Sequence, residues 1–285
     1  MAINYKDITI VLVAYKSNFK IEKILKKIDK KVRILIIENS NDKKTKEYFE
    51  KNYENIKVIL NSENKGQTGG INTGFKNVHT KYCIYMDMDI HFDIKIIDKF
   101  YQIAEKINDF GLLVPPHNKS EYPKEFEFEE TQVKYDNLKR MRIVHGYFMF
   151  FKMSAVKDVG YYDENIFFYF DETDYCLRMI SRNHKIYIVK ETVVQHEEGK
   201  SYDKNIENNN IEYLRQWHYM WGKFYFHKKH YGYIKALLAT FFDLIECLVK
   251  IPILFFFSKN KFKIYVNRIT GLMCSIIGKK SYKRL

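Results

Sequence analysis

ITIVLVAY, the stretch from Ile8 to Tyr15, is an almost unbroken run of apolar and β-branched side chains. Such a run is typical of a strand that is buried on both faces of a sheet. Three similar runs follow at residues 32–38, 56–61 and 82–86, and helical patterns lie between them. Because right-handed crossovers join strands in this arrangement, we expect an α/β fold with a mostly parallel central sheet flanked by helices. Ligands of such sheets bind at the carboxyl ends of the strands.

The composition excludes several classes of protein. Of the 285 residues, 22 are Phe and 23 are Tyr, which is far too much aromatic surface for a disordered chain. The four cysteines lie far apart and form no C-x-x-C pair, which argues against a disulfide framework or a thiolate zinc site. The first residues lack the basic start and cleavage site of a signal peptide. We therefore expect a protein of the reducing cytoplasm.

The positive charge is concentrated at the end of the chain. The formal net charge is +13, and residues 222–285 hold 13 basic residues but only two acidic ones, Asp243 and Glu246. The part before residue 222 is therefore nearly neutral. A basic, aromatic segment of this kind can bind nucleic acid phosphates or anionic lipid headgroups.

The apolar content of this segment favours lipid over nucleic acid. Residues 233–257 form a long apolar run, and four charges fall within an arc of about 80° of its helical wheel: Lys235, Asp243, Glu246 and Lys250. These charges and Pro252 argue against a spanning helix. We expect residues 203–285 to form a helical, amphipathic extension that lies on an anionic membrane surface. Packing on the body of the protein, or a homo-oligomer contact, is the alternative, and no nucleic acid is expected as a partner.

Polar motifs follow three of the predicted strands. Glu38 ends the second strand, where a carboxylate can accept nucleobase N–H groups, although a solvated turn acid is the alternative. A glycine-rich loop, Asn64–Gly74, follows the third strand and leads into a helix whose start favours anions. Asp87 and Asp89 follow the fourth strand, and hard oxygen ligands of this kind suit Mg²⁺ or Mn²⁺.

Two further features carry chemical groups. The acidic pair Asp171 and Glu172 follows an aromatic run at residues 167–170, and partial desolvation by such neighbours raises a carboxyl pKa toward the range of a general base. His196 ends a short predicted strand. A lone histidine is often structural, but imidazole also suits Mn²⁺.

In order and spacing, these motifs resemble those of family 2 glycosyltransferases of the GT-A fold, a Rossmann-like fold. The resemblance covers roughly residues 6–202, which predicts a catalytic domain at 1–202 and the tail at 203–285. The matching motifs are Ile10–Lys16, Glu38–Ser40, Asn64–Gly74, Asp87–Asp89, Gly160–Glu164 with Phe170–Arg178, and His196 with Ser201. The tail is similar to that of bacterial polysaccharide-assembling members.

The resemblance implies a role for each matching residue. Those that would contact the nucleotide-sugar are Ala14, Tyr15, Glu38, Asn64, Gly66, Asn72 and Asp87. Asp89 would bind the divalent metal with help from His196. Glu172 would be the catalytic base and Asp171 would position donor or acceptor. The family order of this pair is Glu-Asp and here it is Asp-Glu, so which of the two is the base stays open.

The implied activity is an inverting, metal-dependent transfer of a hexose from a nucleoside-diphosphate sugar to a hydroxyl of a glycan or lipid-linked acceptor. The family's members often work in cell-surface polysaccharide synthesis, peripherally on the inner face of the cell membrane. One alternative is a nucleotidyltransferase, but the glycine-rich loop that such enzymes carry after the first strand is missing. The other is a non-catalytic nucleotide-sugar-binding scaffold, which would be expected to lose Asp89 or the acidic pair.

Overall fold

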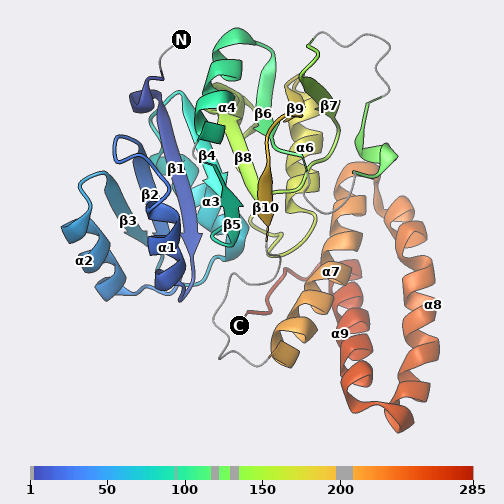
Figure 1. The fold of residues 1–285 in the computed structure, drawn as a ribbon. Coiled ribbons are helices and arrows are strands. Elements are labelled where there is room, and N and C mark those ends of the chain that lie inside the picture. The colour runs from blue at the N-terminus through green and yellow to red at the C-terminus, as the bar shows by residue number, and fades with distance from the viewer. Residues whose placement is uncertain (1–2, 94, 117–121, 129–134, 197–207, 285) are drawn as a thin grey trace. The chain divides into compact units, whose positions relative to one another are not determined.

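The computed structural model describes residues 3–93, 95–116, 122–128, 135–196 and 208–284 (Figure 1). The chain divides into two compact units. The sheet unit contains residues 1–162 and 175–203, and the helical unit contains residues 163–174 and 204–285. The predicted domain boundary at 202/203 lies outside the described residues, as does Ser201.

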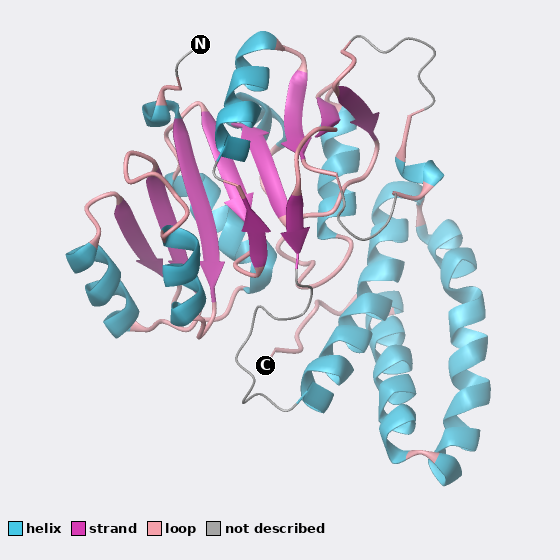
Figure 2. Cartoon of the chain, viewed as in Figure 1, coloured by secondary structure: helices cyan, strands magenta, loops and turns pink. Residues whose placement is uncertain are grey.

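An eight-stranded sheet with the order β3-β2-β1-β4-β8-β6-β9-β7 forms the sheet unit (Figure 2). Its strands are β1 (Ile8–Ala14), β2 (Arg33–Glu38), β3 (Ile56–Leu60), β4 (Tyr82–Met86), β6 (Phe110–Val114), β7 (Leu138–Met141), β8 (Phe148–Lys152) and β9 (Lys185–Val189). Strands β3, β2, β1 and β4 are parallel, whereas β8 runs antiparallel between β4 and β6. The expected α/β class with a mostly parallel sheet is confirmed, and the four predicted strands are β1 to β4.

Helices cover both faces of this sheet. They are α1 (Asn18–Leu25), α2 (Lys43–Asn52), α3 (Gly66–Asn77), α4 (Lys95–Lys106), α5 (Met153–Val159) and α6 (Asp171–Ser181), of which α6 begins in the helical unit. The side chains of β1 alternate between two cores, as the period of a strand requires. Ile10 and Leu12 belong to the core that holds Phe100 of α4, and Val11 belongs to the core that holds Phe75 of α3. The unbroken apolar run therefore reflects burial on both faces.

Two glycines let α3 lie close to β1. A Cβ atom on Gly70 would lie 2.5 Å from Cγ1 of Val13, and one on Gly74 would lie 2.5 Å from Cγ1 of Val11. Both distances are shorter than real Cβ atoms allow. Most of the predicted glycine-rich loop thus forms the first turns of α3. Its glycines set how close the amino end of α3 comes to the carboxyl end of β1.

The helical unit contains three long helices, α7 (Asn208–Tyr231), α8 (Tyr233–Phe257) and α9 (Lys259–Ile276). Gly232, with φ of 91°, links α7 to α8, and the Ser258 side chain caps α9. Gly271 of α9 faces the backbone of Trp217 in α7, where a Cβ would lie 2.2 Å from the Trp217 carbonyl oxygen. Among the described residues, no helix is both long enough and apolar enough to cross a membrane.

The segment before α6 also belongs to the helical unit and packs on α7. Ring centroids of Phe167 and His218 are 5.0 Å apart, and those of Phe170 and Phe226 are 5.5 Å apart. The aromatic run at residues 167–170 is therefore a packing surface for α7.

Candidate active site

The carboxyl ends of β2, β1 and β4 lie along one edge of the sheet. Ala14 pairs with Glu38, and Val11 of β1 pairs with Tyr85 of β4, so the residues that follow these strands emerge side by side. Ala14, Glu38 and Asp87 therefore line the edge at which ligands of parallel sheets bind.

A second, short sheet brings His196 to the Asp-x-Asp motif. β5 (Ile90–Phe92) pairs antiparallel with β10 (Val194–His196), and this register sets His196 opposite Ile90, the residue after Asp89. The His196 Nε2 atom lies 3.2 Å from Asp89 Oδ1 and 3.5 Å from Asp87 Oδ2. One ligand atom from each of the three residues falls within 4.8 Å of the others, a spacing that could hold a metal ion.

The Asp89 carboxylate is the most deeply buried member of this group. The residue is 6% exposed, and neither carboxylate oxygen accepts a well-aligned hydrogen bond from the described residues. Burial acts to raise the pKa of Asp89, but the attraction of the His196 ring and of the Lys20 ammonium outweighs it and holds the pKa below its usual value. A buried, ionised carboxylate whose nearest partner is a histidine ring is well suited to a cation.

Tyrosines hold the other two members in place. The Tyr85 hydroxyl donates to Asp87 Oδ1 at 2.5 Å, and the ring of Tyr147 stacks on His196 with centroids 5.1 Å apart. The Asp87 backbone N–H donates to the Tyr147 carbonyl oxygen at 2.9 Å. Sequence patterns did not point to either tyrosine, because Tyr85 belongs to the apolar run of β4 and Tyr147, directly before β8, is far from His196 in the chain. These contacts orient the carboxylate and imidazole as supporting residues do in metal sites.

Glu38 is buried at the end of β2. It is 0% exposed, and its Oε1 atom accepts hydrogen bonds from the backbone N–H and the hydroxyl of Ser40. Burial raises the pKa of Glu38 even though the Ser40 contacts act to lower it. No hydrogen-bond partner is found for its Oε2 atom among the described residues. The alternative of a solvated turn acid is therefore wrong, because the side chain is removed from water.

Side-chain amides tie the glycine-rich loop to the strand ends. The Gly66 N–H donates to Asn64 Oδ1, and Asn39 Nδ2 donates to the Gly66 carbonyl oxygen, each at 2.9 Å. Gly66 has φ of 68°, a left-handed conformation that favours glycine. Tyr15, just after β1, is partly buried, and its N–H donates to Ser17 Oγ at 3.3 Å. The loop and the turn after β1 are thus held in defined shapes.

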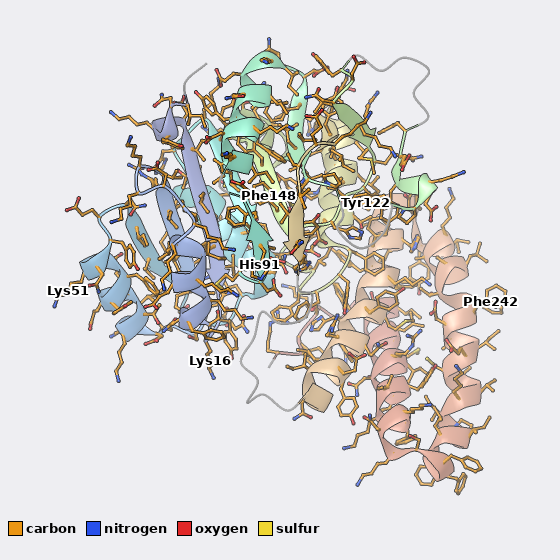
Figure 3. The ribbon with its side chains drawn as sticks, in the orientation of Figure 1. Lys16, Lys51, His91, Tyr122, Phe148 and Phe242 are labelled. Carbon is orange, nitrogen blue, oxygen red and sulfur yellow. The ribbon has the colours of Figure 1, made fainter. Side chains whose placement is uncertain are left out.

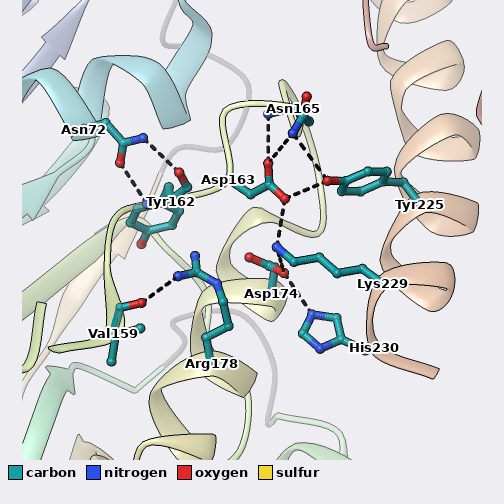
Figure 4. A network of polar contacts seen from close by, with 10 residues as sticks. All are labelled: Asn72, Val159, Tyr162, Asp163, Asn165, Asp174, Arg178, Tyr225, Lys229 and His230. Atoms are coloured by element: carbon teal, nitrogen blue, oxygen red, sulfur yellow. Dashed lines mark hydrogen bonds and ion pairs between the residues drawn. The ribbon is translucent and has the colours of Figure 1, made fainter. Parts of the chain in front are cut away.

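Asn72 has a structural task within the sheet unit. It is 1% exposed, and its side chain exchanges two hydrogen bonds with the backbone of Tyr162, at 2.9 and 2.8 Å (Figure 4). Tyr162 in turn stacks on Tyr175 with ring centroids 4.2 Å apart. The part of Asn72 in shaping the nucleotide loop stays a prediction.

The acidic pair begins α6 in the helical unit. Asp171 is 6% exposed and Glu172 is half-buried. Burial raises the pKa of Asp171 well above its usual range, and the neighbouring Glu172 carboxyl adds to the effect. Tyr169 and Phe170, directly before the pair, have φ of 61° and 66°. Strained conformations of this kind in non-glycine residues are often found at functional sites.

A charged network that sequence analysis missed holds this turn of α6 against α7. Lys229 Nζ lies 2.7 Å from Asp174 Oδ1 and 2.8 Å from Asp163 Oδ2 (Figure 4). The His230 ring nitrogen Nε2 lies 2.8 Å from Asp174 Oδ1, and the Tyr225 hydroxyl donates to Asp163 at 2.8 Å. The only sequence signal was the recurrence of Lys, His and Tyr in the tail, which gave no partner. The predicted meeting of the acidic pair with Asp87 and Asp89 stays a prediction.

Comparisons with known proteins agree with this fold. The family described as "Glycosyl transferase family 2" matches residues 9–160. The low-salt glycan biosynthesis hexosyltransferase Agl10 of Haloferax volcanii is 24% identical over 195 residues, which are 62% of this chain and 62% of that protein. The chain thus matches less than two thirds of the length of this relative.

Two solved structures share the fold. The mannosyltransferase PcManGT of Pyrobaculum calidifontis, solved with GDP-Man and Mn²⁺, is 11% identical, with a TM-score of 0.56 over 96% of this chain and 88% of that one. Residues 1–349 of TarS from S. aureus are 13% identical, with a TM-score of 0.55 over 97% of this chain and 93% of that one. The chain therefore has the expected GT-A fold with a helical C-terminal region.

Proposed function

The chain belongs to glycosyl transferase family 2, and from this we propose that it transfers a hexose from a nucleoside-diphosphate sugar to a hydroxyl group of a glycan acceptor. The observation that carries the proposal is the buried Asp89 carboxylate, which lies beside Asp87 and His196 at the carboxyl edge of the sheet. A related hexosyltransferase and a mannosyltransferase solved with GDP-Man and Mn²⁺ support the same reaction class.

We assign the metal site to Asp87, Asp89 and His196. When bound there, Mn²⁺ or Mg²⁺ would neutralise the charge of the diphosphate leaving group. The buried carboxylate of Asp89 and the oxygen-rich donor set fit such an ion. The Tyr85 and Tyr147 contacts keep Asp87 and His196 oriented toward the same point.

The nucleotide would lie along the neighbouring strand ends. The buried Glu38 carboxyl can exchange hydrogen bonds with the edge of the nucleobase, and its Oε2 atom is available for that purpose. Ala14 and Tyr15 would contact the nucleoside, Asn64, Gly66 and Asn72 would shape the loop, and Asp87 would also face the ribose or the donor sugar. The first turn of α3 offers backbone N–H groups to phosphate.

Sugar transfer would proceed by a single displacement with inversion. The oxygen of an acceptor hydroxyl attacks the anomeric carbon as the bond to the diphosphate oxygen breaks, and Glu172 takes the hydroxyl proton. Burial keeps Asp171 protonated over a wider pH range, which favours the partly exposed Glu172 as base and leaves Asp171 to position donor or acceptor. A retaining route would need a nucleophile on the other face of the sugar, and we assign none.

The proposal extends to where the enzyme works. We place it in the cytoplasm, on the inner face of the cell membrane, with a lipid-linked acceptor in cell-surface polysaccharide synthesis. The exposed apolar side chains of α8 and the basic residues around them support a membrane partner. The cysteines among the described residues are all free, which suits a reducing compartment.

A panel of nucleotide sugars tests the proposal. With Mn²⁺ present, the matching donor should raise the melting temperature and be hydrolysed slowly, and a suitable acceptor should be glycosylated. Binding without hydrolysis or transfer, across the panel and a set of acceptors, would favour a sugar-nucleotide-binding scaffold. Formation of a nucleotide sugar from a sugar phosphate and a nucleoside triphosphate would favour a nucleotidyltransferase.

A further inference from the structure

The two acidic residues of the α8 polar stripe, Asp243 and Glu246, contact the neighbouring helices, whereas Lys235 and Lys250 of the same stripe are exposed. Asp243 Oδ2 lies 2.6 Å from Nζ of Lys223 in α7, and Asp243 Oδ1 lies 3.0 Å from a guanidinium nitrogen of Arg268 in α9. Glu246 accepts from the Tyr265 hydroxyl of α9 at 2.9 Å and from Lys250 at 2.6 Å. The acidic part of the polar arc is thus paired inside the helical unit.

The apolar stripe of α8 faces outward as a consequence. Its exposed members recur at helical spacing along one side and are Ile234, Leu238, Phe241, Phe242, Ile245, Leu248, Val249 and Ile253. Leu238 is 68% exposed and Phe242 is 80% exposed, and Figure 3 shows Phe242 pointing away from the helices. At the rise of an α-helix, the stripe from Ile234 to Ile253 extends over about 28 Å. Exposed apolar surface of this extent marks an interaction site.

Three phenylalanines extend this stripe to the turn between α8 and α9. Phe255, Phe256 and Phe257 are 63%, 80% and 82% exposed. The next turn of chain carries three exposed lysines, Lys259, Lys261 and Lys263. Aromatic rings beside cationic groups are the composition of segments that enter a lipid headgroup region.

The charge around the apolar stripe favours an anionic bilayer over a second copy of the chain as its partner. The two acidic residues after residue 222, Asp243 and Glu246, are both paired with cations of the helical unit, so basic residues dominate the outer charge of α8, α9 and the turn between them. Two copies brought face to face would set like charges against each other, whereas an anionic bilayer offers both acyl chains and negative headgroups.

We infer that α8 and the turn that follows it form a membrane-embedded anchor, which we call the α8–α9 anchor. The stripe and the rings of Phe255–Phe257 enter the acyl boundary of an anionic bilayer, while Lys259, Lys261 and Lys263 bind lipid phosphates. This inference rests on the proposed membrane partner and names the residues that make the contact.

Flotation of the full-length protein with vesicles tests the anchor. Vesicles of phosphatidylcholine alone are compared with vesicles that also contain phosphatidylglycerol. Replacing Phe255, Phe256 and Phe257 together by Ser should weaken binding to both by about tenfold or more, because apolar burial is lost. Replacing Lys259, Lys261 and Lys263 together by Gln should remove the preference for anionic vesicles and the sensitivity to salt. The matched control is Phe19→Ser, which replaces a phenylalanine that is 63% exposed in the sheet unit.

Two readouts separate failure of the anchor from failure of the proposed enzyme. Donor hydrolysis without vesicles should be unchanged in the phenylalanine and lysine variants, whereas Asp89→Ala should lose hydrolysis yet float like the wild type. Circular dichroism checks that each variant folds. Wild-type flotation of both surface variants would overturn the inference. The inference would also be overturned if the wild type sedimented as a dimer and the phenylalanine variant as a monomer that still binds vesicles.

Discussion

The imidazole of His196 lies 3.2 Å from the buried carboxylate of Asp89, although the two residues are far apart in the chain. The β5–β10 pairing makes this contact, and Tyr147 stacks on the other face of the imidazole ring. The arrangement joins a strand-end Asp-x-Asp motif to a distant histidine.

Asp89→Ala should abolish the rise in melting temperature on addition of Mn²⁺ and lower sugar transfer by about 100-fold or more, because the buried ligand is lost. Thermal unfolding with and without Mn²⁺, together with an activity assay, checks both effects. Asp136→Asn, which changes an exposed acid of the same unit, is the control and should behave like wild type. Normal Mn²⁺ stabilisation of Asp89→Ala would place the metal elsewhere.

Glu172→Gln should lower kcat by about 1,000-fold with little effect on donor binding, because the amide cannot take the acceptor proton. Asp171→Asn should retain more activity, since burial already favours the neutral form of that carboxyl. Steady-state kinetics and donor titration of the two variants decide between them. If Asp171→Asn were inactive and Glu172→Gln fully active, the base would be Asp171.

Asp163 should make the stability of the helical unit depend on acid pH. Burial acts to raise its pKa, but Lys229, the Asn165 N–H and the Tyr225 hydroxyl outweigh it and lower the pKa to about 2 from an ordinary value of 3.8. Because the folded-state pKa is the lower one, the carboxylate stabilises the fold above about pH 4, and this stabilisation is lost as the pH falls toward 2. After allowance for solvent screening, it amounts to about 1 kcal/mol.

Urea unfolding of wild type and Asp163→Asn between pH 6 and pH 2 measures this effect. The difference in unfolding free energy between the two proteins should shrink as the pH falls through the window from 4 to 2. Asp136→Asn again serves as the control and should show no such trend. A difference that stays constant down to pH 2 contradicts the prediction.

Lys229→Met should destabilise the protein by about 2 kcal/mol or more, because Asp174, which is 0% exposed, loses a cation 2.7 Å away. Adding Asp174→Asn should cost less than the sum of the two single changes, since the uncompensated charge is then gone. Lys228→Met, at an exposed position of the same helix, should have little effect. Simple additivity in the double-mutant cycle would show that the pair is not coupled.

Gly70→Ala should destabilise the sheet unit by about 1–3 kcal/mol, because the new methyl group would lie 2.5 Å from Cγ1 of Val13. Val13→Ala removes the obstructing methyl groups, so the double variant should recover part of the loss. Chemical denaturation of the three variants measures this. If the double variant lost as much unfolding free energy as the two single variants together, the Gly70 position of α3 and Val13 of β1 would not be in contact.

Much of the fold and part of the site could be predicted from the chain alone. Strands such as β1 and β4 are buried on both faces, so their apolar runs identify them whatever surrounds them. The polar motifs at the ends of β2 and β4 then follow from the rule that parallel strands share a carboxyl edge. Glu38, Asp87 and Asp89 were found in this way, and their common edge needed no coordinates.

Contacts across the fold were decided by tertiary structure. Local periodicity is set by neighbours in sequence, whereas the burial of Glu38, the stacking of Tyr147 on His196 and the pairing of Lys229 with Asp174 depend on which elements pack together. The helical wheel of α8 separates a polar stripe from an apolar one, but a wheel cannot say which stripe faces inward. The partners of Asp243 and Glu246 on α7 and α9 decide that point, because the ion pairs and hydrogen bonds of these two carboxylates turn the polar stripe toward the neighbouring helices and the apolar stripe outward.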